Sequence, residues 1–84
     1  MSQWEKLITE ILKKDAGLRF DDLYKALVKI GYTPSQPKGG GSHYTFRKTG
    51  CMPITLPRHA PMKTAYINLV SDTVRAYLKE EQDG

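Results

Sequence analysis

Residues 42–57, SHYTFRKTGCMPITLP, contain the alternation that decides the fold. In the first half, Tyr44 and Phe46 alternate with polar side chains, which is typical of a strand with one buried face. The return strand, residues 52–57, carries Ile54 and Leu56 with the same period. A three-residue turn pairs Phe46 with Ile54, whereas a two-residue turn places the two apolar faces out of phase. We therefore predict an antiparallel hairpin with the longer turn, which also pairs Tyr44 with Leu56.

This register determines which side chains share the other face of the hairpin. Successive side chains of a strand point to opposite faces. Pro57 is expected opposite His43, which places Arg58 and His59 just beyond that pair, at the same end. The face opposite the aromatic residues is therefore polar and carries His43, Thr45, Arg47 and Thr55.

Helical spacing of apolar residues predicts a helix on each side of this region and one at the N-terminus. Residues 2–14 form the first, beginning with a Ser2–Glu5 capping box. The second begins near Asp21, which we expect to cap it, and ends before Gly31, where a left-handed conformation is expected. The last helix is expected from about Thr64 to Glu80, followed by a frayed tail.

A short edge strand completes the predicted domain. Residues 32–35 are assigned to the edge because Pro34 cannot donate a hydrogen bond to an inner ladder. The order of elements predicts an α+β fold in which a three-stranded antiparallel sheet has helices on one face and an open second face. We expect a single domain over residues 1–84, with a core at 20–80, an additional N-terminal helix and turn at 1–19 and a tail at 81–84.

The composition bounds the possible classes of function. With 84 residues, the chain is long enough for one small domain. No apolar run approaches the roughly 20 residues of a membrane span, and no signal peptide is recognisable, so we expect a cytoplasmic protein and no membrane partner. The single cysteine, Cys51, excludes an internal disulfide framework and a cysteine metal cluster.

Charge is distributed unevenly along the chain. The net charge is +4, and no Asp or Glu occurs between Leu23 and Ser71, where seven basic residues fall. A surface with basic charge only attracts phosphate backbones by releasing condensed counterions. The alternative is that these lysines and arginines serve solubility.

The segment Gly39-Gly40-Gly41-Ser42-His43 leads into the first strand of the hairpin. Glycines are useful where a backbone must approach a ligand closely, although a flexible loop before a surface histidine would look the same. The segment lacks the lysine and the following helix of a nucleotide-binding P-loop.

His43 suits metal-independent cleavage of RNA. Histidine exchanges protons near neutral pH, so it can take the proton of a 2′-hydroxyl or protonate the leaving oxygen. Cationic side chains such as Arg47 and Arg58 can stabilise the additional charge on phosphorus. Two histidines without acidic neighbours make a poor metal site, so no metal and no other cofactor is expected.

These residues resemble the HicA family of messenger-RNA interferase toxins. The similarity covers about residues 20–78, and it rests on Gly31-Tyr32, on residues 41–46 (GSHYTF) and on residues 54–59 (ITLPRH). The resemblance implies a fold similar to double-stranded-RNA-binding domains, messenger RNA as substrate, a HicB-type antitoxin as partner, and His43 as the catalytic histidine. Many members carry a second histidine directly after the first, where this chain has Tyr44, and the N-terminal helix is additional to the family pattern.

We therefore predict an endoribonuclease with His43 as its catalytic residue. The expected RNA-binding residues are Lys38, Gly41, Ser42, Arg47, Lys48, Arg58, His59 and Lys63. Two alternatives remain open: a non-catalytic RNA-binding module that uses the same basic face, and a protein–protein adaptor that uses the helix bearing Trp4. A binding module would retain most of its RNA affinity without His43, and an adaptor would show no salt-dependent RNA binding.

Overall fold

A computed structural model describes residues 2–36, 42–58 and 61–83, and in these ranges it contains three helices and three strands. The strands form one antiparallel sheet in the order β1-β2-β3, so the predicted α+β class is confirmed. In chain order the elements are α1 (Gln3–Leu12), α2 (Phe20–Lys29), β1 (Thr33–Ser35), β2 (His43–Arg47), β3 (Ile54–Pro57) and α3 (Thr64–Asp83).

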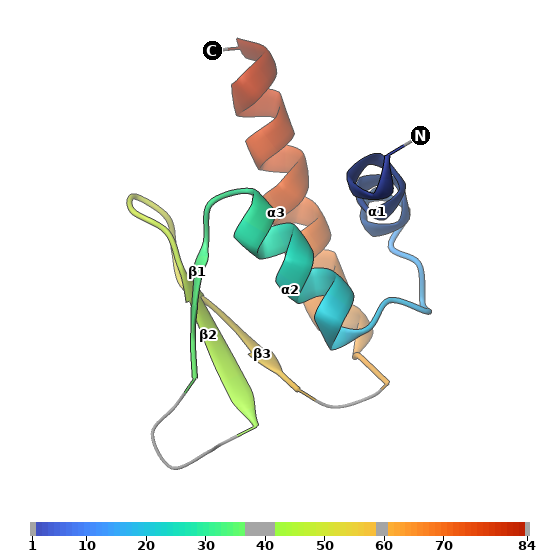
Figure 1. The fold of residues 1–84 in the computed structure, drawn as a ribbon, viewed down its shortest axis with the longest axis vertical. Coiled ribbons are helices and arrows are strands. Elements are labelled where there is room, and N and C mark those ends of the chain that lie inside the picture. The colour runs from blue at the N-terminus through green and yellow to red at the C-terminus, as the bar shows by residue number, and fades with distance from the viewer. Residues whose placement is uncertain (1, 37–41, 59–60, 84) are drawn as a thin grey trace.

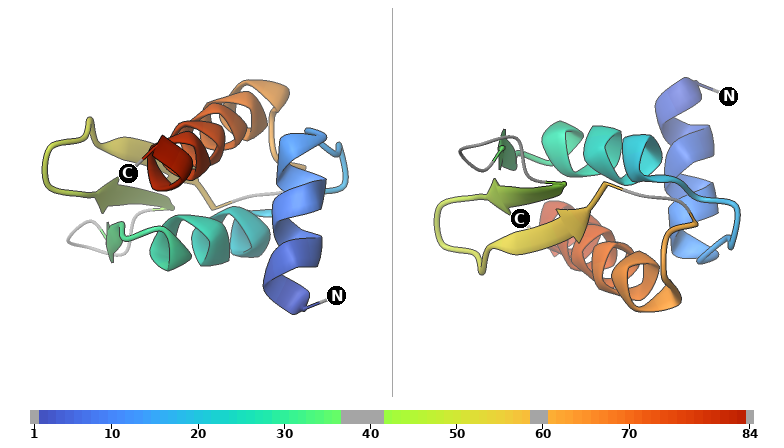
Figure 2. Two further views of the ribbon diagram at one scale, coloured as in Figure 1. Left: turned by 90° about the horizontal axis from the view of Figure 1, so that it is seen from above. Right: turned by 90° about the horizontal axis from the view of Figure 1, so that it is seen from below.

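The three helices lie on one side of the sheet (Figure 1). α2 and α3 are nearest to the strands, and α1 crosses behind them on the side away from the sheet (Figures 1 and 2). The second face of the sheet has no helix over it in the described part of the chain. This is the predicted arrangement, with helices on one face and the other face open.

The hairpin has the predicted register. Phe46 pairs with Ile54, and Tyr44 pairs with Leu56, so their side chains share the face toward the helices. β3 begins at Ile54, two residues later than expected. The delay has a local cause: the Cys51 N–H donates to the Lys48 carbonyl over 3.0 Å and closes a turn, which takes the neighbouring residues out of the ladder.

The core lies between the sheet and the pair α2 and α3. Phe46 and Leu56 are fully buried and meet apolar side chains of both helices. Tyr44 is partly buried, and its ring centroid lies 5.2 Å from that of Phe20 and 6.2 Å from that of Tyr24. The prediction that Tyr44 belongs to the core rather than to the open face is therefore confirmed.

Three predicted helix boundaries differ from the structure, the first being the end of α1, which lies at Leu12 rather than at Lys14. α2 begins at Phe20 rather than near Asp21, and the cap is made differently: the Arg19 N–H donates to the Asp22 carboxylate over 2.9 Å. α3 continues to Asp83, three residues beyond the predicted end at Glu80. Two of the three added residues, Glu81 and Gln82, are strong helix formers, which explains why the expected tail is helical as far as Asp83.

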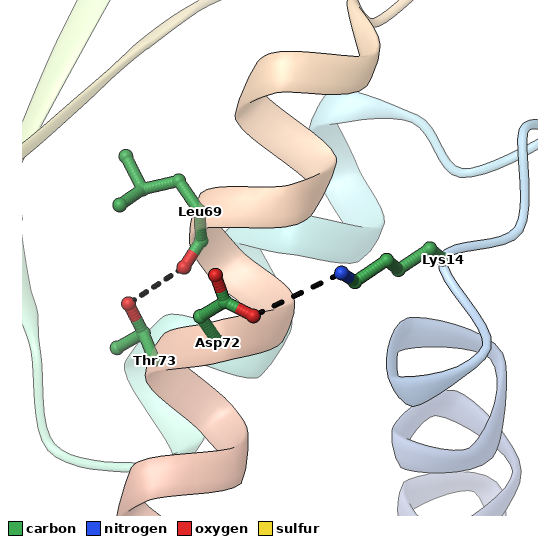
Figure 3. Close-up of polar contacts among 4 residues, drawn as sticks. All are labelled: Lys14, Leu69, Asp72 and Thr73. Atoms are coloured by element: carbon green, nitrogen blue, oxygen red, sulfur yellow. Dashed lines mark hydrogen bonds and ion pairs between the residues drawn. The ribbon is translucent and has the colours of Figure 1, made fainter.

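α1 is attached to α3 mainly by apolar packing. Ile11 is fully buried, whereas the ion pair between Lys14 Nζ and Asp72 Oδ1 is 3.9 Å long and joins two exposed side chains (Figure 3). Exposed pairs of this kind contribute little to stability. In the same view, the Thr73 hydroxyl donates to the Leu69 carbonyl over 2.8 Å, a contact within α3.

Gly31 ends α2 with a φ of +110°, which confirms the expected positive φ at this position. A Cβ atom here would also lie 3.3 Å from Cε of Lys48. We expect Gly31→Ala to lower the free energy of unfolding by about 1–3 kcal/mol, because both the backbone and the contact become strained. Chemical denaturation measures this loss.

Gly50→Ala is the matched control. Gly50 also has a positive φ, +81°, but no atom lies within 4 Å of its Cβ position. It should therefore lose stability through the backbone alone, and by less than Gly31→Ala. An equal loss in the two variants would show that the contact with Lys48 contributes nothing.

Candidate nucleic-acid interface

The site is built on the alternation of β2. Because Tyr44 and Phe46 face the helices, His43, Thr45 and Arg47 face the other way. The His43 side chain is exposed at the start of the strand. The prediction that it lies outward at the head of a core strand is confirmed.

The outward side chains of the three strands form one polar surface, which we call the open face. On β2 and β3, the hydroxyl oxygens of Thr45 and Thr55 are 3.2 Å apart. β1 adds Thr33 opposite Arg47 and Ser35 opposite Thr45. Sequence reasoning missed the β1 residues, because no pattern in the chain fixes the register of so short an edge strand. The open face comprises Thr33, Ser35, His43, Thr45, Arg47 and Thr55, without a carboxylate.

Arg58 lies at the His43 end of the sheet. Its N–H donates to the Ser42 carbonyl over 2.6 Å, one step beyond the pair of His43 and Pro57. Its guanidinium carbon lies 6.0 Å from the centroid of the Tyr44 ring, at the outer range of a cation–π contact. The structure therefore brings the backbones of Ser42, His43 and Arg58 together, and it places the Arg58 guanidinium against Tyr44, on the helix side of the sheet rather than on the open face.

Lys48 has a different environment from the one predicted. Its Nζ donates to the Ile30 carbonyl over 2.9 Å, and it lies 4.8 Å from the centroid of the Tyr77 ring. The side chain thus points toward the helices and connects the turn to the end of α2. Because its ammonium is already bound there, we do not expect Lys48 to contact RNA.

Tyr32 lies beside the same lysine, with Nζ 5.8 Å from its ring centroid. Burial raises the pKa of the Tyr32 hydroxyl, and its interactions with Cys51 and with the Glu80 carboxylate add to the rise. The phenol therefore stays neutral at physiological pH, so this corner of the molecule has the Lys48 ammonium without a phenolate partner.

The remaining predicted contacts are distributed as follows. Lys63 is exposed and precedes α3, whose start lies at the same end of the molecule as the start of β2 (Figure 1). Arg47 is exposed at the opposite end of β2. Three predicted residues lie outside the described ranges: Lys38, Gly41 and His59.

Two acidic side chains lie at the start of α2, which contacts the His43 end of the sheet through Phe20 and Tyr44. Asp21 and Asp22 are in the first turn of α2, where Asp22 is bound to the Arg19 N–H. A polyanion approaching this end therefore meets negative charge toward α2, whereas the described side chains of the open face include no carboxylate. The electrostatics direct it onto the open face.

The described ranges lack the features of two other classes of protein. No three of their histidine, cysteine, aspartate and glutamate side chains are grouped so as to hold a metal ion. Among the same residues, no helix is long and apolar enough to cross a bilayer.

Comparison with models of known protein families, with curated proteins and with solved structures gave no match. The likeness to HicA toxins therefore rests on the residues quoted from the sequence. The chemistry of the open face has to be argued from its own geometry.

We expect the exposed basic residues to differ from Lys48 in the salt dependence of RNA binding. In a His43→Ala background, Arg58→Ala should lower the slope of log affinity against log salt for a mixed-sequence single-stranded RNA by about 1, because one phosphate contact is lost. Lys48→Ala should leave the slope unchanged and instead reduce the free energy of unfolding. Fluorescence anisotropy titrations at several salt concentrations measure the slopes, and equal slopes for the two variants would contradict this assignment.

Proposed function

We propose that this protein is a metal-independent endoribonuclease that cleaves messenger RNA, and that it acts as the toxin of a toxin–antitoxin pair. The observation that carries the proposal is the position of His43, which is exposed at the start of the central strand, on a face whose described side chains include no carboxylate. The resemblance to HicA toxins supports the same reading, with His43 in the position of the family's catalytic histidine.

The proposed reaction uses the RNA's own 2′-hydroxyl. His43 takes the proton of that hydroxyl, and the 2′-oxygen attacks the adjacent phosphorus. The bond from phosphorus to the 5′-oxygen breaks, and that oxygen leaves as a hydroxyl after taking a proton from water. The products are a 2′,3′-cyclic phosphate and a 5′-hydroxyl end, and no redox or metal step is needed.

The backbone of Arg58 adjoins the His43 end of the ladder, but its guanidinium lies over the Tyr44 ring on the helix side, so it would assist from around the end of the sheet. Arg58 adjoins the residue that pairs with His43, and its guanidinium can bind the phosphate oxygens with two parallel hydrogen bonds as negative charge accumulates. The cation–π contact with Tyr44 restricts the side chain in advance, which lowers the entropy lost on binding.

A more specific reading of the fold is part of this proposal. The order α2-β1-β2-β3-α3 has the form α-β-β-β-α that the resemblance implies for a domain similar to double-stranded-RNA-binding domains. α1 is then the additional helix. Messenger RNA as substrate also implies that the protein acts in the cytoplasm.

His43→Ala tests the proposed reaction. We expect the variant to remain folded, because an exposed side chain at the head of a strand contributes little packing. Cleavage of RNA in vitro should fall by about 10²–10⁴-fold, the usual contribution of a general acid–base group, and induced expression should no longer arrest growth. Wild-type cleavage should persist in EDTA.

Arg75→Ala is the control, because it removes one exposed positive charge from α3, behind the sheet. Its cleavage rate should match that of the wild type. Full toxicity of a folded His43→Ala variant would overturn the catalytic role. Activity that disappears with EDTA and returns with Mg²⁺ would overturn the metal-independent mechanism.

The second candidate function is a non-catalytic RNA-binding module. The hydroxyl-rich open face favours it, because serine and threonine side chains and Arg47 can bind sugar and phosphate without any chemical step. The cleavage assay separates the two functions. A binding module would bind RNA without cleaving it, both as the wild-type protein and as His43→Ala, whereas a nuclease would cleave RNA as the wild type and only bind it as His43→Ala.

A HicB-type antitoxin, if it is the physiological inhibitor, should cover the His43 end with an acidic surface, because charge complementarity gives fast association. In the complex we expect slower hydrogen exchange of the backbone amides in β2 and at the end of β3. α1 should be unaffected, since it lies on the far side of α2 and α3 (Figure 2). Protection confined to α1, with RNA cleavage still inhibited, would contradict this mode of inhibition.

A further inference from the structure

A groove of about 480 Å³ lies at the end of β2 remote from His43. Residues of the β2–β3 turn and of β1 line it, and Arg47 and Thr33, which pair across the two strands, belong to both the groove and the open face. None of its lining residues is acidic; they are Gly31, Thr33, Arg47, Lys48, Thr49, Cys51 and Pro53.

A polar track connects this groove to His43. At about 3.3 Å per residue, the four steps from His43 to Arg47 span roughly 13 Å of β2. Between them lies the hydroxyl pair of Thr45 and Thr55, with oxygens 3.2 Å apart. Hydroxyl groups of this kind bind phosphate oxygens and ribose hydroxyls.

Two cationic residues line the groove, and we expect Arg47 rather than Lys48 to bind a ligand there. The Lys48 ammonium is held by the Ile30 carbonyl and by the Tyr77 ring, so the lysine acts as a wall of the groove. Arg47 is exposed, and its guanidinium can adapt to an incoming phosphate.

We propose that this groove is a subsite for the RNA strand, in which Arg47 binds a phosphate about two to four nucleotides away from the one at His43. The range follows from the 13 Å separation: a stacked strand advances about 3.4 Å per nucleotide, and a stretched strand covers the distance in fewer nucleotides. The inference rests on the proposed function, since it takes RNA as the ligand. It adds that Arg47 contributes to RNA binding only when the RNA is long enough to reach both His43 and the groove.

The test compares a mixed-sequence octaribonucleotide with a diribonucleotide in a His43→Ala background, by fluorescence anisotropy. Arg47→Ala should weaken binding of the octanucleotide by about tenfold, the effect of losing one charge-assisted contact. It should leave binding of the diribonucleotide at His43 unchanged, because this ligand cannot reach both positions. Arg47→Lys, which retains the charge, should restore part of the affinity.

Arg75→Ala is again the matched control, and it should change neither affinity by more than about twofold. An equal loss on both lengths for Arg47→Ala would overturn the subsite, because Arg47 would then act through the general positive field. No loss on either length would also overturn it.

Cleavage by the protein with His43 intact separates this inference from the proposed function. If the octanucleotide is cleaved while Arg47→Ala shows no length dependence, only the subsite is wrong. If nothing is cleaved while the length dependence is present, the nuclease is wrong and the subsite belongs to an RNA-binding module. Circular dichroism of each variant verifies that the fold is retained.

Discussion

The aromatic packing beneath β2 determines which face of the sheet is available for function. Phe46 is fully buried, and the rings of Phe20 and Tyr24 lie 6.4 and 5.5 Å from it. A shift of one residue in the strand register would expose this ring and turn Arg47 inward. Exposing a buried Phe costs on the order of 1.5–3 kcal/mol, and burying an unpaired charge costs more. The core thus fixes the outward position of His43, Thr45 and Arg47.

The same alternation explains how far the sequence alone leads. The hairpin register, the face carrying His43, and the core position of Tyr44 follow from a period of two and from matching apolar faces. Arg58 could have been placed by the same rule, since it is two residues after inward-facing Leu56 and therefore lies on the Tyr44 side.

Other features depend on contacts between distant segments, which no local pattern reports. From the sequence, Lys48 is expected to be a surface cation beside Arg47. In the structure its ammonium donates to the Ile30 carbonyl at the end of α2 and lies over the Tyr77 ring of α3. The sequence predicts Asp21 as the N-cap of α2. In the structure Arg19 is the N-cap residue, and its N–H donates to the carboxylate of Asp22. β1 contributes two hydroxyls to the open face by pairing with residues ten to fourteen positions later in the chain.

Many of the HicA toxins that this chain resembles carry a second histidine where it has Tyr44, and this difference constrains the proposed chemistry. Position 44 faces the helices, packed against Phe20 and Tyr24, so a histidine there would not reach the open face without disturbing the core. In this chain the tyrosine ring instead supports Arg58 at the sheet end. Among the described residues of the open face, His43 is then the one side chain suited to proton transfer. In the proposed reaction a single histidine would act, and Arg58 would have to reach the phosphate from the Tyr44 side of the sheet end. A site of this kind relies more on electrostatic stabilisation than on paired acid and base groups, which is consistent with its location on a basic face free of carboxylates.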